Sequence, residues 1–212
     1  MLGVTHAIGG FLAGELIICY GKVPAPEVPV VLAAAVFGSL LPDIDHPESF
    51  LGRRAPVVSD AVGLVFGHRG FTHSLLFLGG VFLFLLAIRF KYVPWFPLTG
   101  AYALVSGILS HLLFDMANPS TVPLLWPWKK GFRFPLPGIP VGSFFEAVFR
   151  AAAVAGVLAL FPSSTAAVAG TLKETGISVP GAPEIVRKTF WLAGEFLRAI
   201  GESLREVSQK LP

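Results

Sequence analysis

Five histidines are the residues of this chain best suited to chemistry, and all of them lie within its first 111 residues. The stretch 43–46 offers two carboxylates and an imidazole, His68 and His73 flank a glycine turn, and His111 stands four residues before Asp115. Residues four apart share one face of a helix, so His111 and Asp115 can bind one metal ion together. A mixed set of imidazoles and carboxylates without sulfur favours zinc, manganese or iron.

Five apolar segments must position these clusters. They run roughly over residues 4–20, 28–42, 74–92, 98–117 and 144–162. If consecutive segments alternate in direction, every polar cluster falls at the same end of the bundle, here called side A. On side A, His6 begins the first segment, 42–46 ends the second, 68–74 begins the third, 110–119 ends the fourth and 142–146 begins the fifth. The sequence therefore predicts one composite site at several helix ends.

The composition indicates a membrane protein. Hydrophobic residues make up 54% of the chain and charged residues 14%, with a mean hydropathy of +0.72; soluble domains average about 25% charged residues. A spanning helix needs about 20 mostly apolar residues, which the five segments approach. The net charge of +3 is spread along the chain and gives no nucleic-acid footprint. We predict an all-α, polytopic membrane bundle of about five helices plus a C-terminal amphipathic helix.

The domain organisation follows from breaks in this pattern. Residues 1–162 are predicted to form the membrane-embedded helical domain and residues 163–183 a linker. Residues 184–212 are predicted as the amphipathic helix, because apolar residues recur there at spacings of three and four. This helix could lie on the membrane, pack on the bundle, or pair with a second copy to make a homodimer through residues 184–210.

Several of these features also have simpler explanations. A single histidine at a helix end is usually a cap, an Asp-rich turn can cap a helix, and many of the Arg and Lys residues could be membrane anchors. Glu15 and Glu146 are harder to explain in this way, because ionisable groups in apolar helices normally face the bundle or a wet cavity. A non-catalytic alternative is a divalent-ion transporter or a metal-stabilised scaffold. A transporter would hold its ligands near the bilayer midplane, whereas here they cluster at helix ends.

Four stretches carry a family resemblance: LLPDIDHPESFLGRR (40–54), FGHRGFTHSLL (66–76), LSHLLFD (109–115) and PLLWPWKKGFRFPLP (123–137). Together they resemble the YdjM-like family of membrane-bound hydrolases, which are expected to depend on a metal, over about residues 1–150. A more distant likeness links the chain to zinc-dependent phospholipase C and P1-type nucleases. His111 and Asp115 match the His-x-x-x-Asp pair of those enzymes, but their later His-x-x-x-Glu pair is missing, and only Glu146 remains of it.

These observations predict a metal-dependent, phospholipase C-like hydrolase that cleaves a phosphoester of a lipid or other amphiphile. The predicted ligands are His6, Asp43, His73, His111 and Asp115, with Asp45 and His46 as further ligands or as residues that orient the histidines. His68 would protonate a leaving group or complete the ligand shell, Arg69 would clamp a phosphate, and Glu146 would be a ligand or a base. One or two ions are expected, zinc first, with manganese or iron as alternatives.

The expected location is the cytoplasmic (inner) membrane, with the site facing the cytoplasm. Side A carries more Arg and Lys than side B, and cytoplasmic loops carry the excess of these residues. The expected partners are membrane lipids and a phosphorylated amphiphilic substrate.

Overall fold

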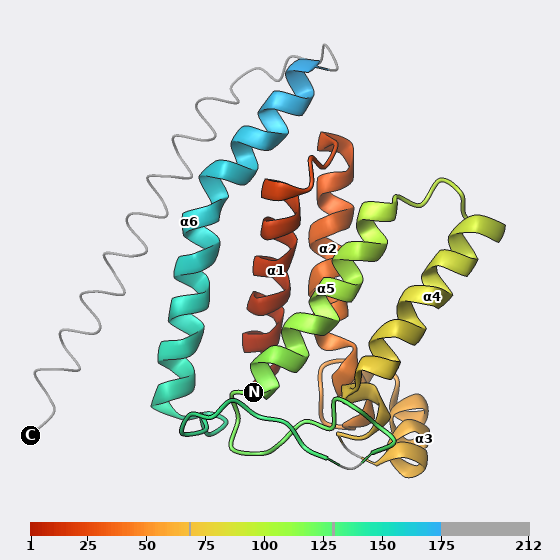
Figure 1. Cartoon of the computed structure of the whole chain (residues 1–212), viewed down its shortest axis with the longest axis vertical. Helices are drawn as coiled ribbons and strands as arrows, with labels where there is room; N and C mark the ends of the chain where they lie inside the picture. The colour runs from red at the N-terminus through yellow and green to blue at the C-terminus, as the bar shows by residue number, and fades with distance from the viewer. Residues whose placement is uncertain (68, 129, 175–212) are drawn as a thin grey trace, which may run out of the picture.

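The computed structural model of the chain describes residues 1–67, 69–128 and 130–174, and it shows a helical bundle (Figure 1). The long helices are α1 (Gly3–Tyr20), α2 (Val28–Leu40), α4 (Leu75–Lys91), α5 (Leu98–Asp115) and α6 (Phe144–Glu174). A short helix, α3 (Pro56–Phe66), lies at one end of the bundle. Single 3-10 turns cover Ala25–Glu27, Pro42–Asp45 (η2), Gly52–Arg54 and Phe71–His73 (η4). Within the described residues, extended pairing is limited to one bridge between Val122 and Phe132. The all-α prediction is confirmed.

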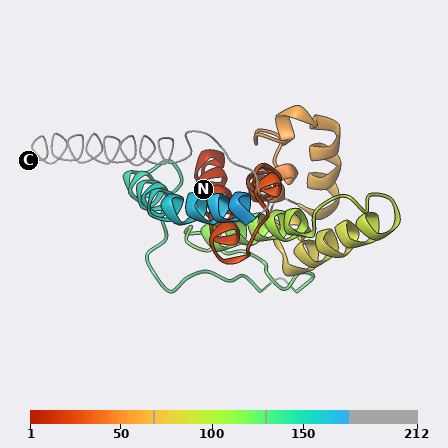
Figure 2. The same cartoon turned by 90° about the horizontal axis from the view of Figure 1, so that it is seen from above.

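Among the described residues, four segments are long and apolar enough to cross a membrane. They are Gly3–Tyr20, Ala25–Asp45, Leu98–Asp115 and Phe144–Gly170. The fifth long helix, α4, has 17 residues and runs beside α5 with none of its residues buried. Seen end-on, α1 lies at the centre and is contacted by α2, α5 and α6, while α4 lies at the edge (Figure 2). The exposed Leu83, Phe84 and Phe90 of α4 suit a surface that faces lipid.

Small residues set how closely α2 approaches its neighbours. A Cβ atom on Gly107 of α5 would lie 2.0 Å from the carbonyl oxygen of Ala35, and one on Gly38 would lie 2.0 Å from that of Leu104. On α1, a Cβ on Gly10 would meet Oγ of Ser39 at 2.4 Å. Glycine is therefore required at these contacts, as expected for helices that pack backbone to backbone in lipid.

The structure differs from the sequence-based expectation in two segments. Residues 42–70, which lie between the second and third predicted apolar segments, contain α3 as well as the 3-10 turns, and α3 is not one of the five predicted segments. α6 continues through Pro162 to Glu174, so residues 163–174 of the predicted linker are helical. A proline removes only one helical hydrogen bond, and the Ala-rich sequence that follows favours the helix. The predicted amphipathic helix and the dimer contact through 184–210 lie outside the described residues.

Candidate metal centre

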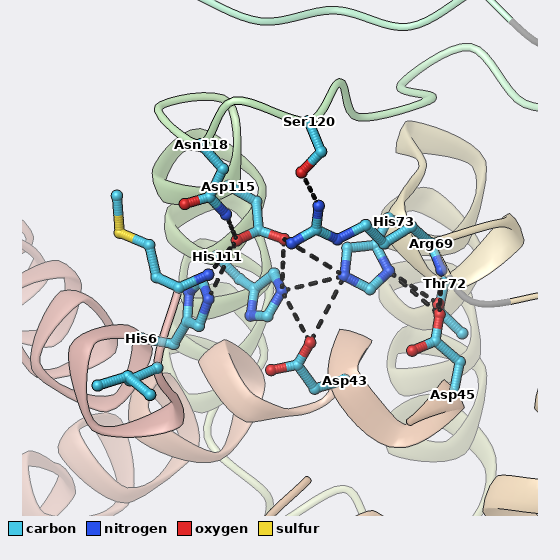
Figure 3. Close-up of polar contacts among 12 residues, drawn as sticks. His6, Asp43, Asp45, Arg69, Thr72, His73, His111, Asp115, Asn118 and Ser120 are labelled. Atoms are coloured by element: carbon cyan, nitrogen blue, oxygen red, sulfur yellow. Dashed lines mark hydrogen bonds and ion pairs between the residues drawn. The ribbon is translucent and has the colours of Figure 1, made fainter. Parts of the chain in front are cut away.

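The predicted clusters meet at one end of the bundle. The polar ends of α1, α2, α4, α5 and α6 all lie at the bottom in Figure 1, as the up-and-down threading predicts. His6 comes from the first turns of α1, Asp43 from η2 after α2, His73 from η4 before α4, and His111 and Asp115 from the last turns of α5. Figure 3 shows these five side chains pointing toward one another from four separate elements.

Ligand atoms of four residues lie close together, and those of Asp43, His73 and His111 lie at the separations that ligands of one ion have. Nε2 of His73 is 3.2 Å from Nε2 of His111, and each of these nitrogens is 3.6 Å from Oδ1 of Asp43. Oδ2 of Asp115 is 3.7 Å from Nε2 of His73 and 3.8 Å from Nε2 of His111. Two nitrogens bound to one tetrahedral zinc at about 2.0–2.1 Å lie about 3.3 Å apart. The residues present therefore fit a divalent cation.

Backbone and side-chain contacts orient both imidazoles. Nδ1 of His111 lies 2.7 Å from the carbonyl oxygen of Ser39, which can only accept, so this nitrogen carries the proton. In the neutral ring, Nε2 of His111 then presents its lone pair to the cluster. Nδ1 of His73 faces Oδ2 of Asp45 at 3.3 Å, so Nε2 of His73 also points to the cluster. Two nitrogens facing each other in this way need a proton or a metal ion between them.

Asp45 lies on the far side of the His73 ring from His111 (Figure 3). Its Oδ2 also accepts from Oγ1 of Thr72 at 2.7 Å and from the backbone N–H of Arg69 at 2.9 Å. A carboxylate behind a ligating histidine fixes the ring and raises its basicity. Of the two roles predicted for Asp45, its position fits the orienting one.

A tight turn brings Arg69 to the cluster. Gly67 has a φ of +73° and Arg69 itself a φ of +58°, while a Cβ on Gly70 would lie 1.9 Å from the carbonyl of Phe66. This backbone explains the two glycines of the GHRG stretch. The guanidinium of Arg69 lies 3.4 Å from Oδ2 of Asp115 and donates to Oγ of Ser120.

His6 lies on the other side of Asp115. Its ring stacks on that of His111 with centroids 3.7 Å apart, and its Nε2 is 3.2 Å from Oδ1 of Asp115. Neither ring nitrogen of His6 makes a hydrogen bond within the described residues, although the side chain is 1% exposed. Oδ1 of Asp115 also accepts from Asn118 at 2.7 Å and lies 2.9 Å from the amino group of Met1. Oδ1 of Asp115 thus faces His6, Asn118 and the amino group of Met1, whereas its Oδ2 faces His73, His111 and Arg69.

The electrostatics of the cluster favour a cation. Burial by itself lowers the pKa of His73, but hydrogen bonds and charge from Asp43 and Asp45 outweigh burial and raise that pKa to about 9. In the metal-free protein near neutral pH, His73 therefore holds a proton in the position that a metal ion would take.

The remaining predicted residues lie elsewhere. Nδ1 of His46 accepts from the backbone of Glu48 at 3.1 Å, and His46 lines the cavity described below rather than the cluster of converging atoms. The carboxylate of Glu146 accepts from the backbone of Leu2, from Thr5 and from the backbone of Gly142 at 2.6–2.8 Å. Glu146 thus anchors the start of α1, an arrangement that differs from the ligand or base predicted for it. His68 lies outside the described residues.

A cavity of about 480 Å³ opens beside Asp43. Its lining combines Arg53 and Arg69 with His46, Glu48 and Ser49. Asp43 is 21% exposed, whereas His73, His111 and Asp115 are at most 1% exposed, so the cluster is reached from the Asp43 side. Sequence reasoning missed Ser39, Thr72 and Asn118. For Asn118, the only signal in the sequence was its position three residues after Asp115.

Comparison with known proteins decides the family. Residues 1–176 match the family described as YdjM inner membrane protein. The chain belongs to this family. The resemblance that the four sequence stretches predicted is thereby confirmed, and the YdjM family name together with the apolar helices supports a multi-pass location in the inner membrane.

Relatives within and around the YdjM family cover different parts of the chain. It is 50% identical over 109 residues to inner membrane protein YdjM of Escherichia coli (strain K12). The match covers 50% of this chain and 54% of that protein, so the chain spans about half the length of that relative. It is 37% identical over 147 residues to the uncharacterized protein YvsG of Bacillus subtilis (strain 168), covering 69% and 85%. With inner membrane protein YbcI of Escherichia coli (strain K12) the identity is 34% over 128 residues, covering 59% and 67%. No solved structure matches the chain.

Proposed function

We propose that this protein is a membrane-bound, metal-dependent hydrolase that cleaves a phosphoester of an amphiphilic substrate. The observation that carries the proposal is the convergence of two overlapping sets of ligand atoms, Asp43 with His73 and His111, and His6 with His111 and Asp115. Five distances among the atoms of His73, His111, Asp43 and Asp115 lie between 3.2 and 3.8 Å. Two imidazoles and two carboxylates favour zinc, with manganese or iron as alternatives. A second ion would lie between His6 and Oδ1 of Asp115, because His6 is stacked beside the first site and its Nε2 faces Oδ1 of Asp115 at 3.2 Å.

The chemistry follows from the groups around the ion. When bound, the metal would polarise a phosphoryl oxygen and lower the pKa of a water molecule. Arg69 and Arg53 line the adjoining cavity, and guanidinium groups bind phosphate oxygens in pairs. Asp45 holds His73 in place, and Ser39 holds His111. The leaving group would be protonated by His68, a role that rests on the sequence alone.

The open side of the cluster supports an enzyme over a scaffold. Structural metal sites are closed by their protein ligands, whereas catalytic sites keep a position open to substrate. Here Asp43 borders the cavity of about 480 Å³. The position of the cluster at helix ends also argues against a transporter, whose ligands lie near the bilayer midplane.

The site is proposed to face the cytoplasm. Among the described residues, the loops at the end of the bundle that carries the cluster contain Arg53, Arg54, Arg69, Lys130 and Arg133, with Arg150 in the second turn of α6. The opposite end carries Lys22, Arg89, Lys91 and Lys173. The excess of positive charge in cytoplasmic loops then orients the bundle.

Metal content and hydrolysis test the proposal together. We would measure zinc, manganese and iron by plasma mass spectrometry in detergent-purified wild type, His111→Ala, Asp115→Ala and Asp43→Asn. Asp43→Asn removes a half-buried charge and should fold, and Asp60→Asn on the exposed face of α3 is its matched control. One or two equivalents in wild type and Asp60→Asn, lost in the other variants, together with metal-dependent phosphate release from phosphorylated lipids, is the expected result. A wild type that takes up none of the three ions would refute the proposal.

A further inference from the structure

The short helix α3 has its polar and apolar faces reversed relative to a helix on the surface of a water-soluble protein. Its inward face is small or polar: Ser59 is 0% exposed, and a Cβ on Gly63 would lie 3.2 Å from the carbonyl oxygen of Asp45. Large apolar side chains form its outward face and are 80%, 87% and 71% exposed, in the order Val57, Leu64 and Val65. An exposed apolar stripe of this kind marks a contact with a partner or a membrane.

The length of α3 excludes a membrane crossing. Its 11 residues rise about 16 Å at 1.5 Å per residue, which is about half of the roughly 30 Å hydrocarbon core. An apolar helix of this length is usually a buried core helix or a segment at the membrane interface. The exposure of α3 excludes the first, and α3 lies at the end of the bundle where the polar ends of the long helices gather (Figure 1). This is the level of a membrane surface.

Both ends of α3 contact side chains that are typical of a membrane interface. At its C-terminal end, the ring of Phe66 lies 6.0 Å from that of Trp126, and tryptophan is enriched where membrane meets water. The turn Gly52–Arg54 directly precedes α3, and the guanidinium of Arg54 lies 3.7 Å from the ring centroid of Phe50, which is 53% exposed. Arginine at this depth can bind lipid phosphates, while the ring beside it lies against the acyl chains.

The apolar surface of α3 leads directly to the lipid-facing helix α4. The ring of Phe71 lies 4.9 Å from that of Phe66 and 5.5 Å from that of Phe77 in the first turn of α4. Leu75 and Leu76 in the same turn are 44% and 53% exposed. The outward face of α3 thus continues a surface that already suits lipid, which favours lipid over a separate protein partner as its occupant.

We propose that α3 lies in the headgroup region of the membrane leaflet next to the metal cluster. Its apolar face would enter the acyl region by about 5–10 Å, as interfacial helices do, and Arg53 and Arg54 would contact phospholipid phosphates. The partner is the phospholipid surface itself. The inference needs neither bound metal nor turnover, so it stands apart from the proposed function. Because Arg53 also lines the cavity beside Asp43, the mouth of that cavity would lie next to the lipid headgroups.

Fluorescence quenching tests this placement in the full-length protein reconstituted in phospholipid nanodiscs. Cys19→Ala removes the native cysteine, and Leu64→Cys in that background carries a bimane label on the outward face of α3. Phe84→Cys, near the middle of α4 and 63% exposed, is the matched control. The nanodiscs contain phosphatidylcholine with a nitroxide either near the glycerol or near the end of an acyl chain. Position 64 should lose several-fold more fluorescence to the shallow nitroxide, and position 84 to the deep one.

Every other pattern of quenching overturns the inference. Quenching of position 64 by aqueous iodide but by neither lipid means that α3 faces water, and stronger quenching by the deep nitroxide means that α3 lies in the hydrocarbon core. A label at position 64 that no quencher reaches means that protein covers α3. Disulfide cross-linking of unlabelled Leu64→Cys would then identify a second copy, and its absence would indicate residues 175–212. An unquenched position 84 would also overturn the inference, because the lipid-facing surface of α4 is part of its argument.

Discussion

Replacing Asp45 by asparagine separates the orienting role of this residue from direct ligation. Oδ2 of Asp45 accepts from Thr72, from the backbone of Arg69 and from Nδ1 of His73, at 2.7, 2.9 and 3.3 Å. The asparagine oxygen can keep the first two hydrogen bonds, so the turn should persist. What is lost is the negative charge behind the His73 ring.

Two effects of opposite sign follow for zinc affinity. Loss of the carboxylate makes His73 a weaker donor, and changes of this kind cost about 10–100-fold in metal affinity, or about 1.4–2.8 kcal/mol. The same loss lowers the pKa of His73 from about 9, so less proton competes with zinc near neutral pH. The full loss should therefore appear only at about pH 9.5, above the pKa of His73, with a smaller loss at about pH 7.

Chelator-buffered zinc titrations at both pH values measure these effects. Wild-type affinity should rise by about 75-fold between pH 7 and pH 9.5, because binding releases one proton from His73, whose pKa is about 9. The rise should be smaller in Asp45→Asn, and Asp60→Asn should behave as wild type. If Asp45→Asn binds zinc as tightly as wild type at the higher pH, the carboxylate does not support His73 and the reasoning is wrong.

Three further predictions test the surroundings of the cluster. Glu146→Gln should lower the unfolding temperature, since charged hydrogen bonds contribute about 1.5–3 kcal/mol each, yet keep the full metal content; a specific loss of metal would instead make Glu146 a ligand. Gly107→Ala should reduce both thermal stability and metal content because its Cβ would meet Ala35, whereas Gly80→Ala, which has open space around it, should reduce neither. The metal-free protein should lose stability as the pH rises through about 9, because the folded state keeps a proton on His73 that the unfolded chain releases above about 6.5. Thermal unfolding of chelator-treated protein at several pH values measures this loss. An unfolding temperature that does not change with pH would contradict the prediction.

The arrangement of the cluster was predictable because two sequence patterns combine: apolar segments that alternate in direction, and a four-residue spacing within one of them. Apolar segments that alternate in direction place His6, 43–46, His73 and His111 at one end, whatever the details of packing. The four-residue spacing of His111 and Asp115 then fixes two side chains on one helix face. For these reasons the sequence brought together the five residues that the structure also brings together.

The roles of the neighbouring residues depend on contacts that no local pattern encodes. Asp45 and Asp43 are two residues apart, and only the turn at Gly67–Gly70 decides that Asp45 faces the back of His73. The partner of His111 is a backbone carbonyl, which any residue at position 39 would supply. Glu146 was expected in the cluster because an ionisable group in an apolar helix needs a partner, and it found three donors around the start of α1 instead.

The geometry of the cluster depends on how the membrane helices pack. Gly107 lets α5 contact the backbone of α2 at Ala35. One turn further along the same contact, Nδ1 of His111 donates a hydrogen bond to the carbonyl oxygen of Ser39. Any shift of α5 against α2 therefore moves His111 and Asp115 together relative to Asp43, which follows α2. Ligand separations of 3.2–3.8 Å leave little room for such a shift. The close glycine contacts in the lipid-embedded part of the bundle thus maintain the ligand geometry at its end.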